Sequence, residues 1–137
     1  MINNKLLIKT FALFIIIGLL DYVGNTFYLH WTEWWFDVML HFLSGGAVAM
    51  FLISVGRSFS SLKSSDITII IVTILGTLLI GILWEIFELY FNITFFSDGV
   101  FYWRDTISDL IMDVCGGFFA TLYSIKIIIR SNELKHE

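Results

Sequence analysis

The chain has 137 residues, of which 58% are hydrophobic, and its mean hydropathy is +0.85. Such a composition is too apolar for an ordinary soluble domain and predicts an integral membrane protein. The formal net charge of −4 is accompanied by no basic stripe, which argues against nucleic-acid binding. The lone cysteine, Cys115, excludes an internal disulfide and is interpreted as a small packing residue.

The first predicted membrane helix covers about residues 5–29 and follows a basic start with Lys5 and Lys9. A basic start before a short apolar core is also typical of a signal peptide. No small-x-small cleavage site follows here and the apolar character resumes further along, so a retained helix is expected. Asp21 and Asn25 lie one helical turn apart near its far end.

A tryptophan-rich connector and a second membrane helix come next. Residues 30–36 contain three tryptophans, and because Trp favours the headgroup level, this stretch is interpreted as an interfacial connector. His30 within it carries no functional indication. The second helix covers about residues 36–56. Small residues give it one face suited to close helix packing, namely Ser44, Gly45, Gly46, Ala47 and Ala49.

Acidic residues mark the last two predicted membrane helices, which cover about residues 67–92 and 104–129. They recur at spacings of three or four residues, so on each helix they share one face. These residues are Glu85 and Glu88 on the third helix, and Asp105, Asp109 and Asp113 on the fourth. The sequence therefore predicts an all-α, polytopic integral membrane protein, with residues 1–137 forming a single four-helix transmembrane bundle.

Basic residues predict the orientation of the four helices. Four spans place both termini on one side of the membrane, and that side, which includes the 57–66 loop, carries seven of the eight lysines and arginines. Those seven are Lys5, Lys9, Arg57, Lys63, Lys126, Arg130 and Lys135, whereas Arg104 falls on the other side. By the positive-inside rule, both termini are predicted to be cytoplasmic.

This topology brings ionisable groups from three separate segments to one level, in the outer half of the membrane. At about 1.5 Å per residue, Glu85 and Glu88 lie roughly 27–32 Å beyond Ile67 and so near the outer boundary of the hydrocarbon. Asp37 and His41 enter from the same side, one helical turn apart, as do the aspartates of the fourth helix. Because lipid-facing acids are costly, these faces are predicted to point inward.

Six carboxylates and one imidazole in a confined space require neutralisation, and three arrangements would provide it. The first is a divalent metal, since Asp and Glu oxygens suit Mg, Mn or Ca and a histidine admits Zn, Mn or Fe. The second is a proton-sharing or substrate-binding network in which several carboxyls are neutral. The third is simple opening of the site to external water. The purely structural alternative is a polar seam that only holds helices together. The candidate metal ligands are Asp37, His41, Glu85, Glu88, Asp109 and Asp113.

The leading functional hypothesis is binding or processing of a membrane lipid or cell-envelope precursor at the outer leaflet. In this hypothesis His41, Glu85 and Asp109 are the catalytic candidates. Arg104 and Asp105 are the substrate-binding candidates, of which Arg104 receives an anionic headgroup. One alternative is a proton- or cation-coupled transporter, against which the nearly apolar inner halves of the helices count. Another is a structural subunit without catalysis, bound to a second copy or to another membrane protein.

Three short motifs resemble those of VanZ-like proteins and of the bacterial membrane proteins of the YjdF type. They are Asp37-x-x-x-His41-Phe42, Glu85-x-x-Glu88 and Arg104-Asp105-x-x-x-Asp109-x-x-x-Asp113-x-x-Gly116. VanZ-like members usually carry Glu-x-x-Gln in the second motif and an asparagine at the position of Asp113. The two departures, Glu88 and Asp113, therefore favour the YjdF type.

The resemblance covers about residues 36–120 and implies a multi-pass protein of the bacterial inner membrane. VanZ-like proteins are linked to reduced susceptibility to a glycopeptide antibiotic, whereas the YjdF type has no assigned activity. The resemblance therefore supports the positions of the candidate site residues, and the proposed chemistry rests on the residues themselves.

Overall fold

The computed structural model describes residues 4–59 and 65–133, which are helical and contain no β-strand in these two ranges. The elements are α1 (Asn4–Thr26), α2 (Leu29–Thr32), α3 (Trp34–Phe59), α4 (Asp66–Tyr90), the short 3₁₀ turn η1 (Phe96–Asp98) and α5 (Val100–Glu133). Four of them, α1, α3, α4 and α5, are long and apolar enough to cross a membrane. The prediction of an all-α bundle with four membrane spans is therefore confirmed.

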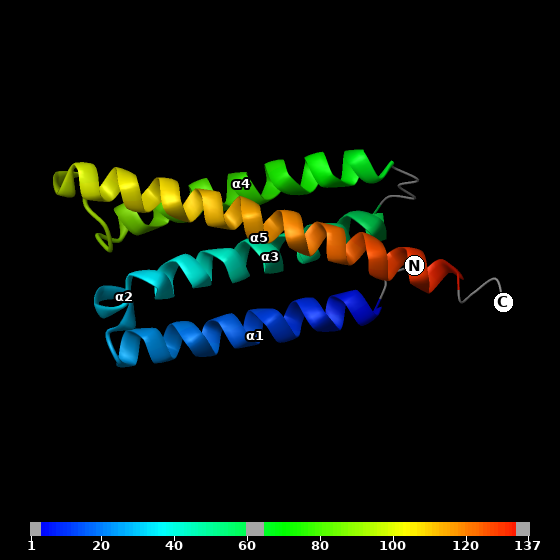
Figure 1. Cartoon of the computed structure of the whole chain (residues 1–137), viewed down its shortest axis with the longest axis horizontal. Helices are drawn as coiled ribbons and strands as arrows, with labels where there is room; N and C mark the ends of the chain where they lie inside the picture. The colour runs from blue at the N-terminus through cyan, green and yellow to red at the C-terminus, as the bar shows by residue number, and fades with distance from the viewer. Residues whose placement is uncertain (1–3, 60–64, 134–137) are drawn as a thin grey trace.

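Helices α3 and α5 form the middle of the bundle (Figure 1). Helix α1 lies along α3, and α4 packs against both α5 and α3. Helix α1 begins and α5 ends at one end of the bundle, whereas α2 lies at the opposite end, here called the α2/η1 end. The cytoplasmic placement of the termini stays a prediction, and two of the basic residues that support it, Lys63 and Lys135, lie outside the described residues.

The chain turns sharply at three residues at the α2/η1 end, and these turns decide where the helices there begin and end. Tyr28 has a φ of 59°, which ends α1 at Thr26 and leads into the four-residue helix α2. Asn92, with a φ of 57°, follows the end of α4. Gly99, with a φ of 61°, lets α5 begin at Val100 rather than near residue 104. Glycine and asparagine tolerate this left-handed conformation better than most residues.

Two glycines allow α3 and α5 to cross at close range. A Cβ atom built on Gly116 would overlap the backbone carbonyl of Phe42 on α3. A Cβ atom on Gly45 would overlap the backbone of Asp113 on α5 in the same way. Small residues at helix interfaces let backbones approach in a membrane, where no hydrophobic force drives helices together. The crossing lies about one turn from His41, so it fixes α3 and α5 relative to each other at the predicted site.

The half of the bundle where α1 begins has an apolar core centred on Leu6, Met50 and Ile53. Its buried hydroxyl groups donate hydrogen bonds to carbonyls four residues earlier on their own helices. These pairs are Thr10 to Leu6, Ser54 to Met50, Thr73 to Ile69, Thr121 to Gly117 and Ser124 to Ala120. The buried hydroxyl groups in this half are therefore largely satisfied within single helices, and the buried acidic groups lie towards the α2/η1 end.

Candidate functional site

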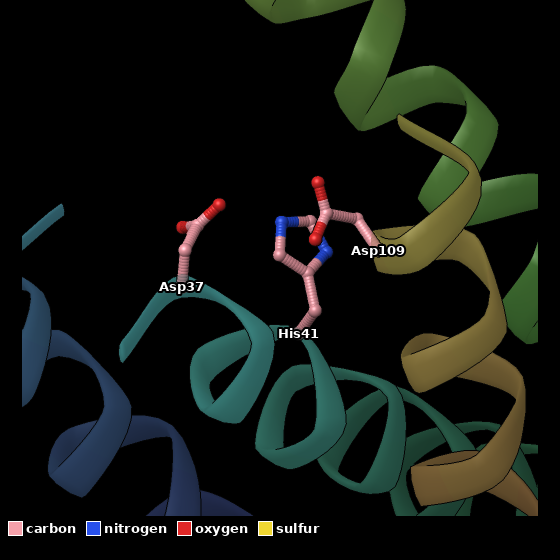
Figure 2. Close-up of side chains that lie close together, drawn as sticks. All are labelled: Asp37, His41 and Asp109. Carbon is pink, nitrogen blue, oxygen red and sulfur yellow. The ribbon is translucent and has the colours of Figure 1, made fainter. Parts of the chain in front are cut away.

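Asp37, His41 and Asp109 face one another near the α2/η1 end (Figure 2). Asp37 and His41 lie one turn apart on α3, and Asp109 comes from α5. Each residue offers one oxygen or nitrogen atom, and these three atoms all lie within 4.8 Å of one another. His41 and Asp109 are only 7% and 3% exposed, whereas Asp37 is half-buried. We call these three residues the Asp–His–Asp cluster.

Asp113 on α5 contacts the Nδ1 side of the His41 ring. Its Oδ2 atom lies 3.4 Å from His41 Nδ1, and both side chains are buried. Room for this carboxylate comes from α4, because a Cβ atom on Gly81 would lie 2.6 Å from Asp113 Oδ2. Figure 2 shows the other nitrogen of the ring on the side of Asp37. Because Nδ1 contacts Asp113, Nε2 is the ring nitrogen available to bind a cation or a substrate group in the cluster.

Two carboxylate oxygens in this region are buried without a hydrogen-bond partner among the described residues. They are Oδ1 of Asp109 and Oε1 of Glu85. The second oxygen of Glu85, Oε2, accepts a hydrogen bond of 2.7 Å from the hydroxyl of Thr106, which lies three residues before Asp109 on α5. A buried oxygen without a partner costs free energy, so both positions call for a cation, a proton or a substrate group.

The remaining predicted site residues lie outside the cluster. Glu88 is half-buried and accepts a hydrogen bond of 2.9 Å from Trp84 Nε1, one turn earlier on α4. Asp105 and Arg104 are both exposed at the start of α5. Of the six predicted metal ligands, the structure therefore brings Asp37, His41 and Asp109 together, with Asp113 behind the histidine, Glu85 against Thr106, and Glu88 on its own helix.

His30 is a polar residue of this region to which the sequence analysis gave no role. Its Nδ1 atom lies 3.2 Å from Asp37 Oδ1, and its Nε2 atom lies 3.3 Å from Asp21 Oδ1. Through this histidine, Asp21 on α1 lies next to the site. Residues on three successive helices carry no common periodicity, so spacing alone gave no signal for the contact.

A family model described as "Predicted membrane protein (DUF2238)" matches residues 4–130. YjdF-type is a known name for this family, which confirms that part of the resemblance, while the relationship to VanZ-like proteins stays a prediction. No curated protein and no solved structure matches the chain.

Proposed function

The chain belongs to this family of predicted membrane proteins, and from that premise we propose that the Asp–His–Asp cluster binds a divalent cation. With that cation, the protein binds or processes a membrane lipid or envelope precursor that carries an anionic headgroup. By the positive-inside argument, the cluster faces the outside of the bacterial inner membrane. The observation that carries the proposal is the cluster itself, in which two carboxylates and an imidazole meet and Oδ1 of the buried Asp109 has no hydrogen-bond partner among the described residues.

The donor set favours a particular group of cations. Two carboxylates and one imidazole suit Mn, Fe or Zn better than Ca or Mg, which prefer oxygen ligands alone. Asp113 supports this reading, because histidines that bind metals usually donate their other ring N–H to a carboxylate. If His41 binds the cation through Nε2, Glu85 is the nearby carboxylate left to accept a proton, because its Oε1 atom has no partner among the described residues.

The surroundings of the cluster favour a lipid-like substrate. Exposed tryptophans at this end, including Trp34 on α3 and Trp103 on α5, are typical of the headgroup level. Arg104 is exposed beside Trp103 and has no ion pair within the described part of the chain. The carboxylates of the site alone would repel an anion, whereas a bound divalent cation together with Arg104 would attract a phosphate or carboxylate headgroup.

A transporter is less well supported. Its path would require polar groups that continue through the half of the bundle where α1 begins. There, the hydroxyls of buried residues such as Thr10 and Thr121 are bonded back to their own helices. This arrangement favours a site that opens only at the α2/η1 end.

We expect retention of an anionic lipid to depend on both the cation and Arg104. Purified protein is incubated with phosphatidylglycerol, with Mn²⁺ or with a chelator, and the bound lipid is counted by native mass spectrometry. Arg104→Gln removes a charge-assisted contact and should weaken Mn²⁺-dependent retention about tenfold, equivalent to about 1.4 kcal/mol. Lys126→Gln, which changes an exposed lysine at the other end of the bundle, is the matched control. Equal retention with Mn²⁺ and with chelator would contradict the proposed function.

A further inference from the structure

We propose that His30 is a positioning residue that holds Asp37 in the orientation needed to bind the cation. This inference rests on the cation site proposed above and extends it to α1 and α2. A carboxylate bound to a metal is usually hydrogen-bonded to a neighbouring group, and loss of that group typically weakens metal binding 10- to 100-fold, an order-of-magnitude range. Asp113 supports the proposed ligand His41 in this way. His30 is the corresponding partner of the proposed ligand Asp37.

His30 lies between two carboxylates on different helices. Its Nδ1 atom lies 3.2 Å from Asp37 Oδ1 and donates to it when that nitrogen carries the proton, which leaves Asp37 Oδ2 for the cluster. Its Nε2 atom lies 3.3 Å from Oδ1 of Asp21 on α1. Asp21 is itself steadied by Asn25, whose side-chain amide donates to Asp21 Oδ2 at 3.2 Å. The chain of contacts therefore runs from α1 through α2 to the cluster on α3.

The position of the His30 ring is fixed by close packing. Its side chain is only 18% exposed, and the ring stands edge-on to Phe36 with a centroid distance of 5.2 Å. Gly24 on α1 provides the space, because a Cβ atom there would lie 2.8 Å from His30 Nε2 and would overlap the Phe36 ring. These contacts hold the His30 ring in one orientation between α1 and α3.

Asp37 is the member of the cluster that most needs this support. His41 is held by Asp113, and Asp109 is almost completely buried on α5, but Asp37 is half-buried in the first turn of α3. Among the described residues, His30 makes the single hydrogen bond of the Asp37 side chain. Without it, the carboxylate can rotate towards water and away from the other two ligands.

The test compares the Mn²⁺ affinity of full-length variants, measured from the signal of free Mn²⁺ in electron paramagnetic resonance. His30→Ala should weaken Mn²⁺ binding about tenfold or more. His30→Asn should recover part of the affinity, because its amide nitrogen lies near the position of Nδ1 and can donate to Asp37. Thr32→Ala, in the same short helix, is the control. It should bind as the wild type does, because the Tyr28 carbonyl is the only hydrogen-bond partner of the Thr32 hydroxyl among the described residues.

The outcomes separate this inference from the proposed function. A wild-type protein that binds no Mn²⁺ overturns both. Tight wild-type binding with unchanged affinity in His30→Ala and His30→Asn overturns the positioning role alone. A purely structural role would lower thermal stability in these variants and leave the affinity of the folded protein unchanged. If His30→Ala does not fold, Asp21→Asn at a half-exposed position must weaken Mn²⁺ binding severalfold, and unchanged affinity there overturns the inference.

Discussion

Asp109→Asn should remove Mn²⁺ binding, lowering the affinity of the purified protein about 100-fold or more. The change deletes one of two negative charges in the Asp–His–Asp cluster and replaces a ligand oxygen by an amide NH₂ group, which repels a cation. Removal of a residue that only supports a metal ligand typically weakens metal binding about 10- to 100-fold. Asp109 offers the cation an oxygen directly, so its loss should weaken binding at least as much as the upper figure. The measurement is a Mn²⁺ titration in detergent, followed by electron paramagnetic resonance.

The control for this variant is Asp98→Asn, which makes the same chemical change in η1. Asp98 is exposed and lies near the same end of the bundle, but it has no contact with the cluster. Its affinity should stay at the wild-type value. Similar Mn²⁺ affinity in the wild type and in Asp109→Asn would remove Asp109 from the cation site and leave proton sharing or a structural seam as the reading of the cluster.

Gly116→Ala should destabilise the fold by about 3 kcal/mol, the upper part of the usual range for overpacking. The added methyl group would overlap the backbone carbonyl of Phe42, and a backbone atom cannot move aside as a flexible side chain can. Helices α3 and α5 must therefore separate. Because the same crossing places His41 opposite Asp113, the variant should also bind Mn²⁺ more weakly. The free energy of unfolding is measured by titration with a denaturing detergent, with tryptophan fluorescence as the signal.

Gly56→Ala provides the matched comparison within α3. Among the described residues, and apart from its chain neighbours and the backbone of its own helix, a Cβ atom on Gly56 meets no atom within 4 Å, so the substitution adds no clash. It should leave the free energy of unfolding unchanged or raise it by up to about 1 kcal/mol, since alanine favours a helix more than glycine does. Equal stability of the Gly116 and Gly56 variants would contradict the close crossing of α3 and α5.

Hydropathy and helical spacing predicted most of the architecture. The four apolar segments became four membrane-length helices, and their ends shifted by a few residues where Tyr28 and Gly99 turn the chain. The spacing of Asp37 and His41 placed both on one face of α3, as observed. Such predictions succeed because length and periodicity are properties of a single helix.

Selection among the acidic residues could not be predicted in the same way. Asp105 belongs to the same four-residue repeat as Asp109, but the structure buries Asp109 and exposes Asp105. Which aspartate of such a repeat is buried depends on where the neighbouring helices begin and end, and on how each helix is rotated about its axis. The contact of His30 with Asp37 depends in turn on the corner formed after Tyr28, which no periodic pattern encodes.

The most direct test of the cation site is pulsed electron paramagnetic resonance on the Mn²⁺-loaded wild-type protein and on His41→Gln. This method detects a nitrogen atom bound directly to Mn²⁺. The proposed site predicts a nitrogen coupling from His41 in the wild type and its loss in His41→Gln. A wild-type spectrum without this coupling, or a coupling that persists in His41→Gln, would contradict a cation held by Asp37, His41 and Asp109.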